Sequence, residues 1–146
     1  MTQVDFHFNV PDKMQYACRL LRKAVNSGAK VVVTGPGELL QQLDVQLWTF
    51  SQTDFIAHAL LPDPHGVAAA SDIVLTEQAR LAEHRQVLLN LADSIPHDLE
   101  LFERLVEIVS LEDADRTLAR NRWKHYAGLG LELIQHDLAK KSDNLR

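Results

Sequence analysis

The run KVVVT at residues 30–34 most constrains the fold of this chain, because consecutive β-branched residues suit a strand buried on both faces of a parallel sheet. Before it, residues 3–10 alternate polar and apolar side chains as a half-buried strand does, and residues 13–27 have the apolar spacing of a helix. Gly28 stands where that helix needs a left-handed cap. With a second helix expected over residues 39–47, the order strand, helix, strand, helix predicts an α/β fold.

The middle of the chain continues this alternation less regularly. Residues 55–66, FIAHALLPDPHG, contain two prolines and a glycine and are expected to form a surface loop. Short apolar runs at residues 72–76 and 86–91 predict two further strands, with a polar connector between them that has the composition of a short helix.

The last third is expected to end in a helix. Residues after Pro96 have helical spacing as far as Leu105, and residues 106–110 then predict a strand. Ser110 and Asp113 resemble a capping box, from which the final helix is expected to run to residue 128 or 130.

The size of the chain favours one domain, since 146 residues of which 46% are hydrophobic can bury one sizeable core. We expect a single α/β domain over residues 1–141 and a frayed polar tail over residues 142–146. The expected sheet is largely parallel and covered by helices on both faces, a Rossmann-like topology without a nucleotide site. No apolar run reaches 18 residues, so the expectation is a cytoplasmic protein with no membrane partner.

A nucleotide site is not expected at residues 31–40, VVVTGPGELL, although Gly35 and Gly37 follow a predicted strand. The third glycine of the dinucleotide fingerprint and the Lys-Ser/Thr pair of a P-loop are both missing. Glu38 places a negative charge at the helix start, where it repels phosphate.

The sequence predicts no other cofactor, metal or catalytic group. The seven histidines are scattered, and none pairs with another at the i, i+4 spacing of a metal-binding helix face. Asp63, His65 and Asp72 could converge in the central loop, but each is ordinary turn or cap chemistry. Cys18 lies among apolar helical neighbours and is expected to be a buried, inert thiol.

The segment ARNRWKHY, residues 119–126, is basic and aromatic in a chain whose formal net charge is -5. On a helix, Arg116, Arg120 and Lys124 follow one another at i, i+4 and i+8, with Trp123 on the same stripe. Charges of one sign beside an exposed aromatic ring favour a binding surface. The alternative is that Trp123 folds back onto the domain and the charges only solvate the helix.

The opposite side of this helix is expected to face the core. Its residues are Leu118, His125 and Leu129.

Three classes of function remain open from these residues: an adaptor for an acidic peptide, a direct single-stranded nucleic-acid binder and a nucleotide-dependent enzyme. A strand binder normally needs several stacking aromatics along a continuous basic groove, which an acidic chain does not favour. An enzyme needs a complete phosphate turn or an acid/base pair, and the sequence predicts neither.

Three segments carry a resemblance to a known family: ARNRWKHY preceded by EIVSLEDADRTL, LWTFSQTDFIAHAL at residues 47–60, and VLLNL. In these segments and in nearly its whole length, the chain resembles the chi subunit family of bacterial DNA polymerase III. The resemblance implies a nucleotide-binding-like α/β fold without nucleotide chemistry, used as a non-catalytic adaptor of the clamp-loader assembly that reaches DNA only indirectly.

The resemblance also implies a binding site for the acidic C-terminal tail of single-stranded DNA-binding protein. The implied residues are Arg116, Arg120, Trp123 and Lys124, with Val109 as a floor for the peptide. Guanidinium groups suit the carboxylates of such a tail, and an apolar platform suits its terminal phenylalanine ring. Arg120, central in the stripe, is expected to hold the terminal carboxylate.

A second implied surface includes Trp48 and Phe55, which in the family receive the psi subunit or a helicase. Ala57 departs from the proline often found at that position, which weakens the correspondence there. From the residues alone, a tryptophan that ends an amphipathic helix is more often half-buried core than an interface anchor.

Overall fold

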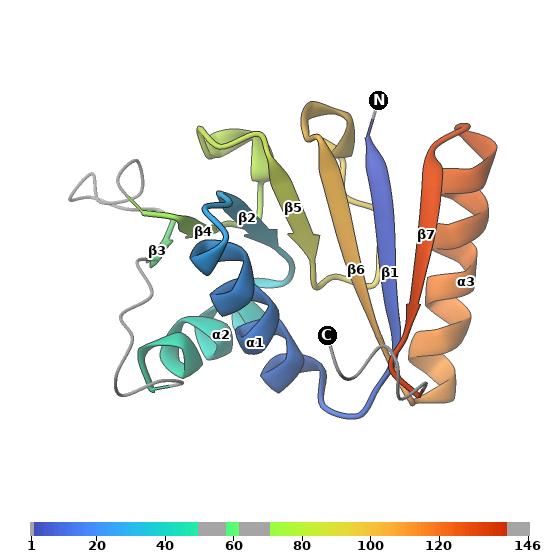
Figure 1. Ribbon diagram of the computed structural model, residues 1–146, viewed down its shortest axis with the longest axis horizontal. Coiled ribbons are helices and arrows are strands. Elements are labelled where there is room, and N and C mark those ends of the chain that lie inside the picture. Colours follow the sequence, from blue (N-terminus) through green and yellow to red (C-terminus); the bar gives the residue numbers. More distant parts are fainter. Residues whose placement is uncertain (1, 50–57, 62–70, 140–146) are drawn as a thin grey trace.

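The computed structural model describes residues 2–49, 58–61 and 71–139 and contains one seven-stranded sheet. Every strand pairing in it is parallel, and the order across the sheet is β3-β4-β2-β5-β6-β1-β7 (Figure 1). The strands are β1 (Gln3–Val10), β2 (Val31–Thr34), β3 (His58–Leu60), β4 (Ile73–Leu75), β5 (Val87–Asn90), β6 (Arg104–Ser110) and β7 (Glu132–Asp137). The helices are α1 (Lys13–Asn26), α2 (Gly37–Thr49) and α3 (Asp113–Gly128), with 3-10 turns η2 (Ala79–Leu81) and η3 (Leu99–Leu101).

The helices cover both faces of the sheet, as predicted. Helices α1 and α2 lie on one face and α3 lies on the other (Figure 1). Strand β2 is buried along its whole length, because Val31 and Val33 pack with α1 and α2 whereas Val32 packs in the core cluster beneath α3. This confirms the α/β class inferred from the β-branched run.

Helix α1 forms where its sequence places it. The Asp12 carboxylate accepts the Gln15 N–H at 3.0 Å, which caps the first turn, and Gly28 adopts a φ of 88° just past the end. Cys18 is fully buried on this helix, and burial raises the pKa of its thiol to about 11. The prediction of a buried thiol is confirmed.

Two predicted elements were wrong. His58–Leu60 form strand β3 inside the segment expected to be a loop, and β3 pairs with β4. Helical spacing after Pro96 produces only the turn η3, in which Phe102 N–H donates to the Leu99 carbonyl at 3.1 Å. Leu105 already belongs to β6, because pairing with β1 and β5 there outweighs a three-residue apolar period.

Strand β7 was not predicted, since the final helix was taken as the last element. It follows Gly130, whose φ of 77° turns the chain back, and it pairs with β1 at the sheet edge. Its residues are half-buried or exposed, so it lacks the strict alternation of a strand with one dry face. Residues 140–146, which include the expected tail, lie outside the described residues, and none of the described helices is long and apolar enough to cross a membrane.

The turn between β2 and α2 is unsuited to phosphate. A Cβ at Gly35 would lie 3.1 Å from Leu91, and one at Gly37 would lie 3.3 Å from a Glu77 carboxylate oxygen, so both glycines allow close packing. Glu77 thus adds a second negative charge to that of Glu38 at the start of α2. Of the three residues considered for convergence in the central loop, Asp72 forms an ion pair with Lys30, in keeping with an ordinary structural role.

The other two members of that group, Asp63 and His65, lie outside the described residues.

Candidate protein-interaction surfaces

Helix α3 is fixed to the sheet by a buried polar network around Glu107 of β6. Glu107 is fully buried, and its Oε2 atom lies 3.2 Å from Arg122 Nε of α3. The Tyr126 hydroxyl donates to the same oxygen at 2.6 Å, and Asn90 Nδ2 donates to it at 3.1 Å. Arg122 also donates to the Asp93 carbonyl at 2.8 Å. The network joins α3 to β5, β6 and the loop after β5.

The charges in this network depend on one another. Burial raises the pKa of Glu107, and the Arg122 charge and the hydrogen bonds from Tyr126 and Asn90 oppose that rise. Burial and the adjacent carboxylate of Glu107 raise the pKa of Tyr126, so its hydroxyl stays a donor. Because Arg122 and Tyr126 must face inward to complete the network, they set the rotation of α3 about its axis.

The start of α3 differs from the predicted capping box. Glu112 occupies the N-cap position without a side-chain cap, and the carboxylate that reaches back belongs to Asp115, not Asp113. Asp115 Oδ2 accepts the Ser110 N–H at 2.8 Å, and Lys13 Nζ lies 3.5 Å from Oδ1. Partial burial alone would raise the pKa of Asp115, but the Ser110 hydrogen bond and Lys13 outweigh it and lower the pKa.

The outer face of α3 carries the predicted cationic stripe. Arg120 and Lys124 are exposed and Arg116 is half-buried. Among the residues that the structure describes, none of the three forms an ion pair with a carboxylate. Trp123 is half-buried because its ring packs edge-on against Phe6, with centroids 5.0 Å apart and an interplanar angle of 62°.

The prediction for the opposite side of α3 was wrong. Leu118 is 39% exposed, Leu129 is 54% exposed and His125 is also exposed. The spacing of apolar residues alone does not decide which side of α3 faces the core. The Glu107 carboxylate instead makes an arginine, Arg122, the inward-facing residue.

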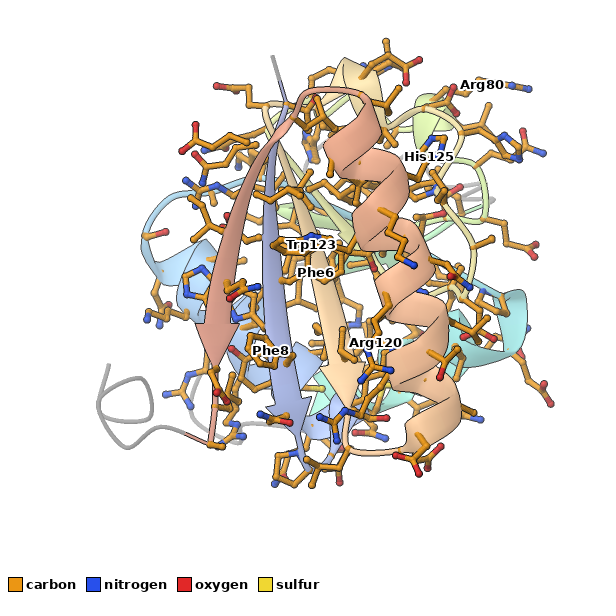
Figure 2. The ribbon with its side chains drawn as sticks, turned by 90° about the vertical axis from the view of Figure 1, so that its right-hand side faces the viewer. Phe6, Phe8, Arg80, Arg120, Trp123 and His125 are labelled. Carbon is orange, nitrogen blue, oxygen red and sulfur yellow. The ribbon has the colours of Figure 1, made fainter. Side chains whose placement is uncertain are left out.

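Aromatic side chains lie between α3 and the edge strand β7. In Figure 2, Trp123 and Phe6 lie between these two elements, and Phe8 and Arg120 lie farther toward the carboxyl end of β1. Phe8 and Leu133 are half-buried at the margin of the same core cluster. We refer to the following residues as the α3–β7 surface: Phe8, Arg116, Arg120, Trp123, Lys124 and Leu133.

Phe8 was not predicted as a site residue. The alternation of residues 3–10 already placed it on the same face as Phe6, but only the pairing of β1 with β7 brings that face beside α3. Val109, expected as a floor for a peptide, is 4% exposed and packs beneath α3 in the core. Val109 therefore supports the packing of α3 against the sheet.

A second apolar surface lies at the end of α2. Trp48 is 58% exposed and Val45, one helical turn earlier, is 62% exposed. The centroids of the Trp48 ring and the buried His58 ring lie 4.6 Å apart, and His58 Nε2 lies 3.2 Å from Asp44 Oδ1. Phe55, the other residue expected here, and Ala57 lie outside the described residues. We refer to Val45 and Trp48 as the α2 surface.

Comparison with known proteins identifies the relatives of this chain. The family model described as DNA polymerase III chi subunit, HolC, matches residues 1–134. DNA polymerase III subunit chi of Pseudomonas aeruginosa is 32% identical over 146 residues, which cover 96% of this chain and 99% of the relative. The corresponding subunit of Escherichia coli is 29% identical over 121 residues, covering 82% of this chain and 81% of the relative.

Proposed function

Because this chain belongs to the chi subunit family of DNA polymerase III, an accessory and non-catalytic subunit in DNA replication, we propose that it is an adaptor. Its α3–β7 surface binds the acidic C-terminal tail of single-stranded DNA-binding protein. Through that contact it links the strand-coating protein to the clamp-loader assembly in the cytoplasm. The single observation that carries the proposal is a stripe of cations on α3 that forms no ion pair with the described carboxylates and lies beside half-buried aromatic rings.

The chemistry of such a tail matches this surface. Its carboxylates favour guanidinium groups, which form charge-assisted and often forked hydrogen bonds. Arg120, exposed and central, is assigned the terminal carboxylate, and Arg116 and Lys124 are assigned upstream aspartates. A terminal phenylalanine ring would pack on Trp123 and Phe8, whose rings are already held by the core cluster.

We further propose that the α2 surface is the docking site for the psi subunit, or for a helicase. Half-exposed Trp48 beside exposed Val45 is an apolar patch on an otherwise polar helix end, which is typical of an interface anchor. Phe55 would belong to the same site. The two surfaces lie on opposite faces of the sheet, so both partners could bind together.

Direct binding of single-stranded DNA is the second candidate function, and it is less well supported. The net charge is -5, and the aromatic rings on the α3–β7 surface occupy one short patch instead of a long groove. A titration of the protein with a fluorescent tail peptide, a scrambled peptide and a bare oligonucleotide separates the two functions. The adaptor function predicts binding of the tail peptide alone, and oligonucleotide binding at physiological salt without a peptide signal would contradict it.

A further inference from the structure

A cluster of two histidines and an aspartate lies on the sheet face opposite α3. Phe6 and Phe8 of β1 face α3, so the residues that alternate with them, Asp5 and His7, face the other way. The parallel register of β1 and β7 pairs His7 with His136. One donor atom from each of Asp5, His7 and His136 lies within 4.8 Å of the others, and the two imidazole rings stack 4.4 Å apart.

Neighbouring side chains orient the members of this cluster. The Tyr16 hydroxyl forms a 2.5 Å hydrogen bond with His7 Nδ1, and Gln3 Nε2 donates to Asp5 Oδ1 at 3.0 Å. Such outer contacts resemble those that fix the tautomer and direction of metal ligands. Asp5 is only 5% exposed, and a carboxylate as buried as this one normally has charged or hydrogen-bonding partners.

His136 supplies a separate observation. Its Nε2 atom is enclosed by protein and has no hydrogen-bond partner among the described residues, and Asp5 Oδ2 is 4.0 Å away. A buried polar atom without a partner normally has an unseen water or ion beside it. The atom therefore points to a ligand held between the two strands.

We propose that Asp5, His7 and His136 bind one divalent transition-metal ion, of which Zn²⁺ fits the donor set best. Two imidazole nitrogens with one carboxylate oxygen suit zinc, whereas magnesium and calcium prefer sites built from oxygen alone. Zinc bonds of about 2.0–2.2 Å in a tetrahedron place the donors roughly 3.5 Å apart, so these side chains close inward by about 1 Å on binding. The fourth position faces an open groove of about 1010 Å³ that all three residues line.

The charges facing the cluster decide how tightly the ion is held. Arg104 Nε lies 3.6 Å from Asp5 Oδ2 and competes for the same oxygen, while Lys23 of α1 and Glu132 of β7 line the same groove. The Arg104 side chain is 50% exposed, so it can turn to solvent when an ion takes its place.

The ion would join the edge strand β7 to β1. These strands hold Phe8 and Leu133 on the other face of the sheet, so an ion here would stabilise the edge that carries the α3–β7 surface. Binding of the ion does not depend on which peptide the α3–β7 surface takes.

The test is calorimetric titration of the chelator-treated full-length protein with ZnCl₂, together with the visible absorption of added Co²⁺. We expect binding of one ion per chain, a fall in affinity of at least tenfold in Asp5→Asn and His136→Ala, and tighter binding in Arg104→Ala. His125→Ala removes an exposed imidazole on α3 and is the matched control, which should bind as the parent does. Absence of binding at micromolar Zn²⁺, or equal losses in His136→Ala and His125→Ala, would overturn the proposal.

Thermal unfolding separates metal binding from a folding defect. Zn²⁺ should raise the melting temperature of the parent and of His125→Ala, and it should raise that of His136→Ala and Asp5→Asn by a smaller amount. Each variant is compared with its own metal-free form, so a lower starting stability does not obscure the result. A zinc-induced rise of the same size in His136→Ala contradicts the proposed ligand set.

Discussion

Arg122 of α3 and Glu107 of β6 form an ion pair with 3.2 Å between Nε and Oε2, buried beneath the helix that carries the proposed peptide site. The pair places a cation on the inward face of α3 and leaves Arg120 and Lys124 outside. Two arginines two residues apart therefore have opposite roles: Arg122 holds the helix, and Arg120 is available to a partner.

Arg122→Ala should lower the free energy of unfolding by about 3–5 kcal/mol, because it leaves Glu107 as an uncompensated buried charge. Arg120→Ala removes the same group from the exposed face and should change stability by no more than about 0.5 kcal/mol. Urea unfolding measures both values. Equal effects of the two substitutions would show that the buried pair does not fix α3.

The Asp115 carboxylate should make stability depend on pH. Its pKa in the folded chain is lowered below the usual value, so its contribution is present at neutral pH and is lost as pH falls through the folded-state pKa. Asp115→Asn should therefore cost about 1 kcal/mol at pH 7 and close to nothing in strong acid. Unfolding curves of parent and variant between pH 7 and pH 2 test this, and a gap that stays constant with pH would contradict it.

Trp48→Ala should leave folding nearly intact, because more than half of that side chain is exposed. Its loss should abolish capture of purified psi subunit or helicase while tail-peptide binding is unchanged. Val45→Ala is the companion variant on the same helix face. A marked fall in melting temperature for Trp48→Ala, with partner capture retained, would return the ring to a structural role.

Trp123→Ala should weaken tail binding with little change in its salt dependence, since the lost contact is apolar. The ring also packs on Phe6, so this substitution should lower stability as well, whereas Phe8→Ala at the margin should cost less. Peptide titrations at several salt concentrations, paired with thermal unfolding, separate the two effects. A binding loss in Trp123→Ala that disappears at high salt would mean that the ring acts through charge.

Much of the fold could be predicted because β-branched runs and apolar helical spacing are local signals. Strand β2 and helix α1 follow directly from such signals, with Gly28 marking the end of the helix. Strand β7 could not be predicted, because an edge strand that is half-buried has no regular apolar period. Strand β3 has only three residues, and it is defined by its pairing with β4.

Of the candidate peptide site, only the cationic residues could be predicted from the sequence. Spacing on a helix places Arg116, Arg120 and Lys124 on one stripe, and the structure leaves Arg120 and Lys124 exposed. Inward burial of Arg122 depends on Glu107, which lies in another element and gives no local signal. Likewise, His7 and His136 meet across paired strands, so a search for histidines one helical turn apart cannot find them.

The most direct test of the adaptor function is the affinity of a fluorescent tail peptide for the parent, Arg120→Ala and Arg19→Ala, measured by anisotropy over a range of salt concentrations. Arg19 is exposed on α1, across the sheet from α3, and its loss removes the same charge away from the proposed site. Arg120→Ala should weaken binding by about ten- to a hundredfold and flatten the salt dependence, because a charge-assisted hydrogen bond is worth roughly 1.5–3 kcal/mol. Arg19→Ala should bind the tail peptide as the parent does. A folded Arg120→Ala protein that binds the tail with the affinity of the parent would show that the cations on α3 only face solvent.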